Sequence, residues 1–111
     1  MKGNEMKIQK QVRQGDVLVT PVACIPASAK PAKTKKRVVL AEGEATGHMH
    51  AIDFSAKQMS VFMDGPQMYL RVKHPVTLTH QEHAAATIEP GDYIVKRQVE
   101  VWLDEVRQVA D

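Results

Sequence analysis

Two short stretches of the sequence hold four of its five histidines. In "GHMH", His48 and His50 are two positions apart, and because successive strand residues alternate faces, both rings would leave one face about 7 Å apart. In "HQEH", His80 and His83 are three positions apart, a spacing that brings both rings to one side of a helical turn or tight loop. Imidazole nitrogens are ligands for Zn, Fe, Ni or Mn. The sequence therefore predicts a divalent metal site made by His48, His50, His80 and His83, provided that the fold brings the stretches together.

The carboxylates beside these histidines suggest what such a site could do. A metal-bound water needs a general base, and Glu82 or Glu44 would supply one. A serine nucleophile would need an elbow such as G-x-S-x-G, which the sequence lacks, and Cys24 lies between prolines and is expected to be inert. The alternative is a polar pocket without metal, in which each histidine sits at a turn or strand end and bonds to the backbone. Whether the protein is an enzyme stays open.

Short strands separated by turn signals must position these residues. "GDVLVTPV" predicts a strand that follows a Gly-Asp turn, and "VVLAEGE" predicts another that leads to a turn or bulge at Gly47. "DGPQ" separates two alternating apolar runs and predicts a hairpin, in which Met68, Leu70 and Val72 share one face. After the turn at "PGD", the longest strand is expected to start at Tyr93 and to continue as far as residue 102.

Only the last segment has helical periodicity, in the spacing of Leu103, Val106 and Val109. The 111 residues fit one domain, with residues 1–10 frayed and residues 25–37 forming a basic, proline-containing loop. The fold class predicted is mainly β: a single-domain small barrel or sandwich with a short C-terminal helix.

Charge and cysteine content limit the classes of function. A net charge of +2 is too small for a dedicated nucleic-acid binder, although five of the basic residues lie between Lys30 and Arg37 and could meet phosphates. No aromatic residue is interleaved with them. One cysteine cannot form an internal disulfide, and the sequence shows neither a signal-peptide run nor a membrane-spanning run. We therefore expect a cytoplasmic protein with no membrane contact, which could form a homodimer through a sheet edge.

Two resemblances point to the same residues. The H-x-H of His48 and His50 is similar to the strand motif that begins the metal site of cupins, which implies a β architecture with convergent imidazoles. The sequence also resembles a set of small uncharacterised proteins from bacterial and phage genomes. "RQGDVLVTPV", "VLAEGEATGHMHAI", "LTHQEHAAATIEPGDYIVKRQVE" and "VRQVAD" carry this second resemblance, which covers most of the chain beyond residue 12. It marks both histidine motifs as parts of one pattern and implies no particular activity.

Three functions follow from these features. The first is a histidine-cluster protein that binds a divalent metal ion, extending to a small metal-dependent enzyme. The second is a non-catalytic accessory or assembly module of phage or mobile-element type, in which the histidines shape an interface or hold the fold. The third is a weak nucleic-acid binder that uses residues 30–37.

Overall fold

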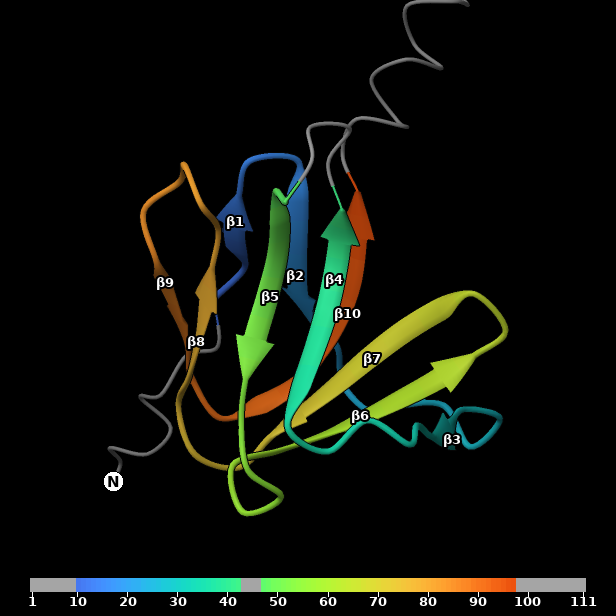
Figure 1. The fold of residues 1–111 in the computed structure, drawn as a ribbon. Coiled ribbons are helices and arrows are strands. Elements are labelled where there is room, and N and C mark those ends of the chain that lie inside the picture. The colour runs from blue at the N-terminus through green and yellow to red at the C-terminus, as the bar shows by residue number, and fades with distance from the viewer. Residues whose placement is uncertain (1–9, 43–46, 98–111) are drawn as a thin grey trace, which may run out of the picture.

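The computed structural model describes residues 10–42 and 47–97, which form two antiparallel sheets (Figure 1). The larger sheet contains, in spatial order, β1 (Val12–Gln14), β2 (Val17–Pro21), β10 (Gly91–Arg97), β7 (Gln67–Val72), β6 (Met59–Asp64) and β3 (Lys30–Pro31). The smaller sheet contains β4 (Arg37–Glu42), β5 (Met49–Asp53), β8 (Val76–Thr79) and β9 (Ala86–Ile88). In Figure 1, β4 and β5 pass in front of β2 and β10, while the β6–β7 hairpin extends to one side.

One apolar core lies between the sheets, and strand alternation explains its composition. Val17 and Val19 of β2 are fully buried, and Val76 and Leu78 of β8 are buried while the threonines between and after them are exposed. Inward residues of both sheets join one cluster, which includes Ile52 of β5. Because the core is mainly aliphatic, its stability comes from side-chain burial at two-residue spacing. The predicted β class is confirmed.

The hairpin predicted around "DGPQ" is confirmed. β6 and β7 pair antiparallel from Met59↔Val72 to Asp64↔Gln67, with Gly65 and Pro66 in the turn. Gly65 has a φ of +60°, which the first central position of a type II′ turn requires.

Two expectations need correction. The described chain is sandwich-like, and the barrel alternative is wrong, because the two sheets do not close on one another. At one edge of the larger sheet, β3 is only two residues long and pairs with β6 alone. The basic stretch over residues 25–37 is also not wholly loop, since Lys30 pairs with Met63 and Pro31 with Phe62.

Several sequence predictions concern residues outside the described part. They are the frayed start (residues 1–9), the continuation of the last strand beyond Arg97, and the helix over residues 103–109. Within residues 10–42 and 47–97, no helix is long and apolar enough to cross a membrane.

A bulge in β4 bends the smaller sheet beside the histidine motif. Val39 pairs with Ala51 and Ala41 pairs with His50, so Leu40 is the extra residue. His50 lies on the same face of β5 as the fully buried Ile52. The ring of His50 therefore stands at one end of the core, between the two sheets.

Candidate functional site

The four predicted histidines lie in one cluster, which we call the histidine cluster. The ring centroid of His80 is 4.3 Å from that of His50, 4.6 Å from that of His83 and 5.7 Å from that of His48. The cause is strand pairing: Ala51 of β5 is opposite Thr79 of β8, so residues just before β5 lie beside those just after β8. Both segments lie at the same end of the molecule as the β1–β2 turn (Figure 1).

His50 is the buried member of the cluster, and Gln14 of β1 holds its ring. His50 is 5% exposed and Gln14 is 3% exposed. The Gln14 amide nitrogen Nε2 donates to the backbone carbonyls of Leu78 and Ala84, each at 2.9 Å. Its oxygen Oε1 therefore faces His50 Nδ1 at 2.8 Å and can only accept. Nδ1 carries the proton, and the lone pair of the neutral ring is on Nε2.

Asp16, in the β1–β2 turn, faces that lone pair. Its Oδ1 is 3.6 Å from His50 Nε2, a separation too long for a hydrogen bond. Its Oδ2 accepts from Arg97 Nε at 3.1 Å and from Arg97 Nη2 at 2.6 Å. Arg97 reaches Asp16 because it pairs with Val17, the next residue after the turn.

The pKa values of His50 and Asp16 are both lowered, so a neutral ring faces a carboxylate. Burial lowers the pKa of His50, and the neighbouring His80 lowers it further, against a smaller opposing effect of Asp16. Burial alone would raise the pKa of Asp16, but the hydrogen bonds and the charge of Arg97 outweigh it and hold this pKa below 3.8. At neutral pH two acceptor atoms therefore face one another, and their contact is not an ion pair.

The loop after β8 carries the outer part of the cluster. The backbone N–H of Met49 donates to Gln81 Oε1 at 2.8 Å, which ties this loop to β5. The backbone N–H of Glu82 donates to His80 Nδ1 at 3.0 Å. Glu82 Oε2 lies 3.7 Å from His48 Nε2, and the Glu82 side chain is 68% exposed. The cluster is therefore buried at His50 and opens to solvent at Glu82; we call this solvent-exposed side its mouth.

Gly15 allows the turn to approach the rings. A Cβ at this position would be 2.9 Å from His83 Nε2 and 3.2 Å from His50 Cε1. Its φ of +59° is also in the left-handed region that other residues seldom adopt. A residue without a side chain is therefore required where the β1–β2 turn passes the cluster.

The ring spacing suits a shared ion, whereas the present orientation of the donor atoms does not. Tetrahedral ligands at a metal–nitrogen distance of about 2.1 Å have ring centroids roughly 5 Å apart. Four of the six ring pairs in the cluster, all except His48–His50 and His48–His83, have centroid separations from 4.3 to 5.8 Å. Among the described residues, however, no group of three His, Cys, Asp or Glu side chains is arranged to hold a metal ion. The ring nitrogens of His50 and His80 face Gln14, Asp16 and the Glu82 backbone instead.

The sequence predicted the histidines and missed two of their partners. Glu82 lies at the mouth of the cluster, and Glu44 is outside the described residues. From the sequence, Asp16 is expected only in a Gly-Asp turn, and Gln14 has no predicted role. A usable signal existed: Gln14 is two positions after Val12 on the inward face of β1, where a polar residue needs a buried partner.

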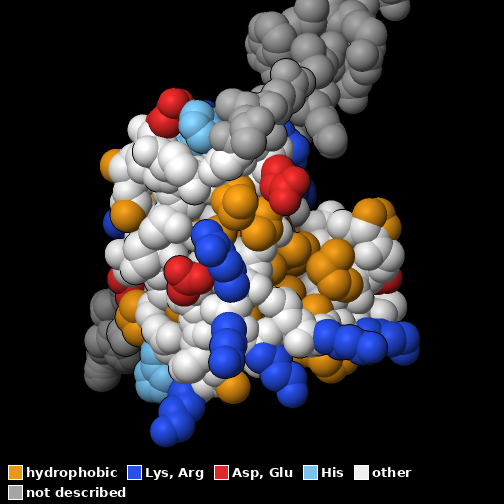
Figure 2. All heavy atoms as spheres, viewed as in Figure 1, with side chains coloured by type: hydrophobic (Ala, Val, Ile, Leu, Met, Phe, Trp, Pro, Cys, Tyr) orange, Lys and Arg blue, Asp and Glu red, His pale blue; other side chains and the backbone are white. Residues whose placement is uncertain are grey.

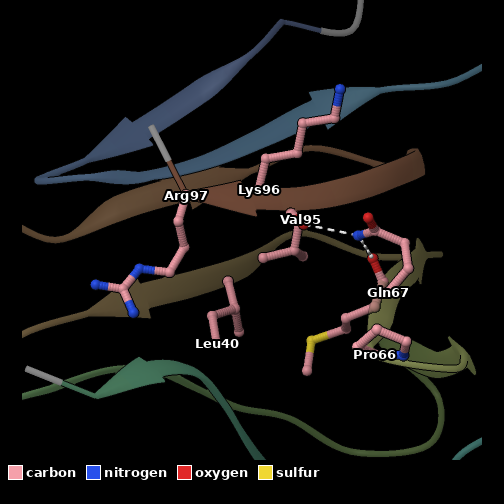
Figure 3. Close-up of a pocket in the computed structure, with 7 residues that line it drawn as sticks. Leu40, Pro66, Gln67, Val95, Lys96 and Arg97 are labelled. Atoms are coloured by element: carbon pink, nitrogen blue, oxygen red, sulfur yellow. Dashed lines mark hydrogen bonds between the residues drawn. The ribbon is translucent and has the colours of Figure 1, made fainter. Parts of the chain in front are cut away.

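A separate apolar groove of about 480 Å³ lies between β4 and the β6–β7 turn (Figure 3). It is lined by Leu40, Pro66, Gln67, Met68, Val95, Lys96 and Arg97. Figure 2 shows apolar side chains gathered between β4 and the hairpin. Gln67 Nε2 donates across the groove to the Val95 carbonyl at 2.8 Å. Arg97 is the one lining residue that also contacts the histidine cluster's partners, through Asp16.

The basic residues of the 30–37 stretch are exposed near the start of β4, whereas the histidine cluster lies toward the opposite end of the molecule (Figure 1). In the view of Figure 2, Lys and Arg side chains are spread across the lower edge.

The fold and the cluster define a small sandwich-like β protein with a histidine-rich site at one end of its core. The chain belongs to a family described as a domain of unknown function (DUF8820), whose model matches residues 13–98. That match includes the whole histidine cluster together with Gln14 and Asp16. No curated protein matches the chain significantly, and no solved structure does.

Proposed function

We propose that this protein binds one divalent transition-metal ion at the histidine cluster. The observation that carries the proposal is the convergence of four imidazoles from two distant stretches, in which each ring has a neighbouring ring centroid within 5.7 Å. Each imidazole has one nitrogen lone pair to offer, so a single cation can be the common partner of several of these rings.

The support of His50 by Gln14 is a second argument. Metal-ligating histidines generally donate the N–H of the non-ligating nitrogen to a carbonyl or carboxylate, which fixes the ring and its tautomer. Gln14 Oε1 accepts from His50 Nδ1 in this way and leaves Nε2 available. The buried amide thus plays the part that an outer-sphere partner has in known metal sites.

Binding requires a local change at the mouth of the cluster. The Glu82 N–H donates to His80 Nδ1, so the proton of the neutral His80 ring is on Nε2. His80 can act as a ligand only once this hydrogen bond breaks, which leaves either Nδ1 or, after a shift of the ring proton to Nδ1, Nε2 as the ligating atom. Both residues lie in the loop after β8, where such a change does not disturb the core.

The solvent-exposed side of the cluster would also allow a metal-dependent reaction. Catalytic metal sites keep one coordination position for water or substrate. Glu82, with Oε2 3.7 Å from His48 Nε2, is the described carboxylate best placed to act as a general base for a bound water.

The test measures bound metal in protein purified without a histidine tag, before and after incubation with Zn, Fe, Ni and Mn followed by desalting. We expect near-stoichiometric metal in the wild type and its loss in His48→Ala and His80→Ala. His74→Ala is the matched control, because His74 is exposed, follows β7 and lies outside the cluster. It should retain the wild-type metal content.

Thermal unfolding gives an independent readout. An ion at 100 times its Kd stabilises the folded state by about 2.7 kcal/mol, which raises the Tm of a domain of this size by roughly 10–20 °C. A wild-type protein that retains no metal and shows no shift in Tm with any of the four ions would overturn the proposal.

A further inference from the structure

The distance between His50 Nε2 and Asp16 Oδ1 is close to that between two ligands of one ion. Tetrahedral ligands at about 2.1 Å from a metal are roughly 3.4 Å from each other. His50 Nε2 and Asp16 Oδ1 are 3.6 Å apart, longer than a hydrogen bond and close to this value. Both atoms are acceptors, because the proton of the His50 ring is on Nδ1.

The surrounding residues fix which atoms are available. Gln14 cannot turn its amide without losing two bonds to backbone carbonyls, so it keeps His50 Nε2 free of a proton. Arg97 occupies Oδ2 of Asp16 and leaves Oδ1 as the free oxygen. The guanidinium of Arg97 offsets the negative charge of Asp16 and fixes its orientation, so Oδ1 can offer a lone pair to an ion.

We propose that Asp16 is a direct ligand of the ion, paired with Nε2 of His50, and that Gln14 is the positioning residue of this pair. This inference rests on the proposed metal-binding function and deepens it. The fixed ligands of the ion are then the buried His50 and the half-buried Asp16, and the histidines of the loop after β8 complete the site. A mixed set of imidazole and carboxylate ligands suits a borderline divalent ion such as Zn²⁺.

The test compares Zn²⁺ affinities of the full chain by competition with a chelating dye. We expect Asp16→Asn to weaken binding by about tenfold or more. Asp92→Asn is the matched control, since Asp92 is equally exposed at 21% and is held by Arg71 as Asp16 is held by Arg97. Asp92→Asn should bind Zn²⁺ as the wild type does. Asp16→Glu, which keeps the carboxylate, should bind more tightly than Asp16→Asn.

A nitrogen NMR measurement on the wild type keeps the inference testable even where a variant does not fold. In the metal-free protein, His50 should show a protonated Nδ1 and an unprotonated Nε2, and Zn²⁺ should shift the resonance of Nε2. A protonated Nε2 that Zn²⁺ leaves unchanged would overturn the inference.

The two proposals fail in different ways. A wild type that binds none of Zn, Fe, Ni and Mn refutes metal binding itself. A wild type whose affinity is lost in His48→Ala and His80→Ala but retained in Asp16→Asn refutes only the role of Asp16.

Discussion

Replacing Gln14 with leucine should destabilise the fold far more than a glutamine substitution usually does. The amide makes three hydrogen bonds, to the carbonyls of Leu78 and Ala84 and to the ring of His50. Leucine has a similar size and fills the space, but it leaves these partners unpaired. Each buried polar group that loses its partner costs about 1–3 kcal/mol.

The magnitude depends on which partners water can reach. Ala84 is exposed, so water can replace the lost bond to its carbonyl. Leu78 and the His50 ring are buried, which leaves two uncompensated groups. Allowing for the apolar burial that leucine gains, we expect a loss of about 2–4 kcal/mol in the free energy of unfolding. This corresponds to a fall in Tm of roughly 10–25 °C.

Urea unfolding of metal-free protein, followed by circular dichroism, measures this loss. Gln11→Leu is the control, because Gln11 is exposed and makes one bond to Thr20 Oγ1 at 3.2 Å. That variant should lie within about 0.5 kcal/mol of the wild type. If Gln14→Leu loses less than about 1 kcal/mol with an unchanged m value, Gln14 does not hold the histidine cluster.

Two further substitutions test other parts of the structure. Gly15→Ala should lose at least about 1 kcal/mol in urea unfolding, because its φ of +59° is unfavourable for alanine; wild-type stability would contradict the turn geometry. Tyr93 donates to the Glu89 carbonyl at 2.7 Å, and burial raises its pKa above 10.0. The unfolded tyrosine loses its proton first, so wild-type stability falls as pH rises above about 10. Tyr93→Phe loses the hydrogen bond to Glu89 and should cost about 1 kcal/mol in the free energy of unfolding at pH 7. A stability difference between wild type and variant that does not shrink above about pH 10 would refute this.

The strands were predictable because their signal is local. An apolar run after a Gly-Asp turn marked the strand of Val17, and two-residue alternation marked the strand of Leu70. Gly65 with Pro66 marked the hairpin turn. The choice between barrel and sandwich was not predictable in the same way. It depends on which distant strands pair, such as β2 with β10 through Thr20↔Ile94, and no local pattern encodes that partnership.

The candidate site was predictable to a similar degree. Imidazoles at recognisable spacings drew attention to His50 and His80, while their meeting depends on the pairing of β5 with β8. The contacts of Gln14 and Asp16 with His50 were not predictable, because "QGD" in isolation indicates only an ordinary turn. Their role arises only when the turn folds against a ring that is 36 positions away from Gln14.

The pair of Asp16 and Arg97 has a consequence for the timing of assembly during synthesis. The two residues are 81 positions apart, and Gln14 is 64 and 70 positions from its two carbonyl partners. Contacts of such high sequence separation form late and slowly. A nascent chain must expose residue 97 outside the ribosome before Asp16 is held in place. A chain stalled earlier therefore has Asp16 without the guanidinium that holds it beside His50.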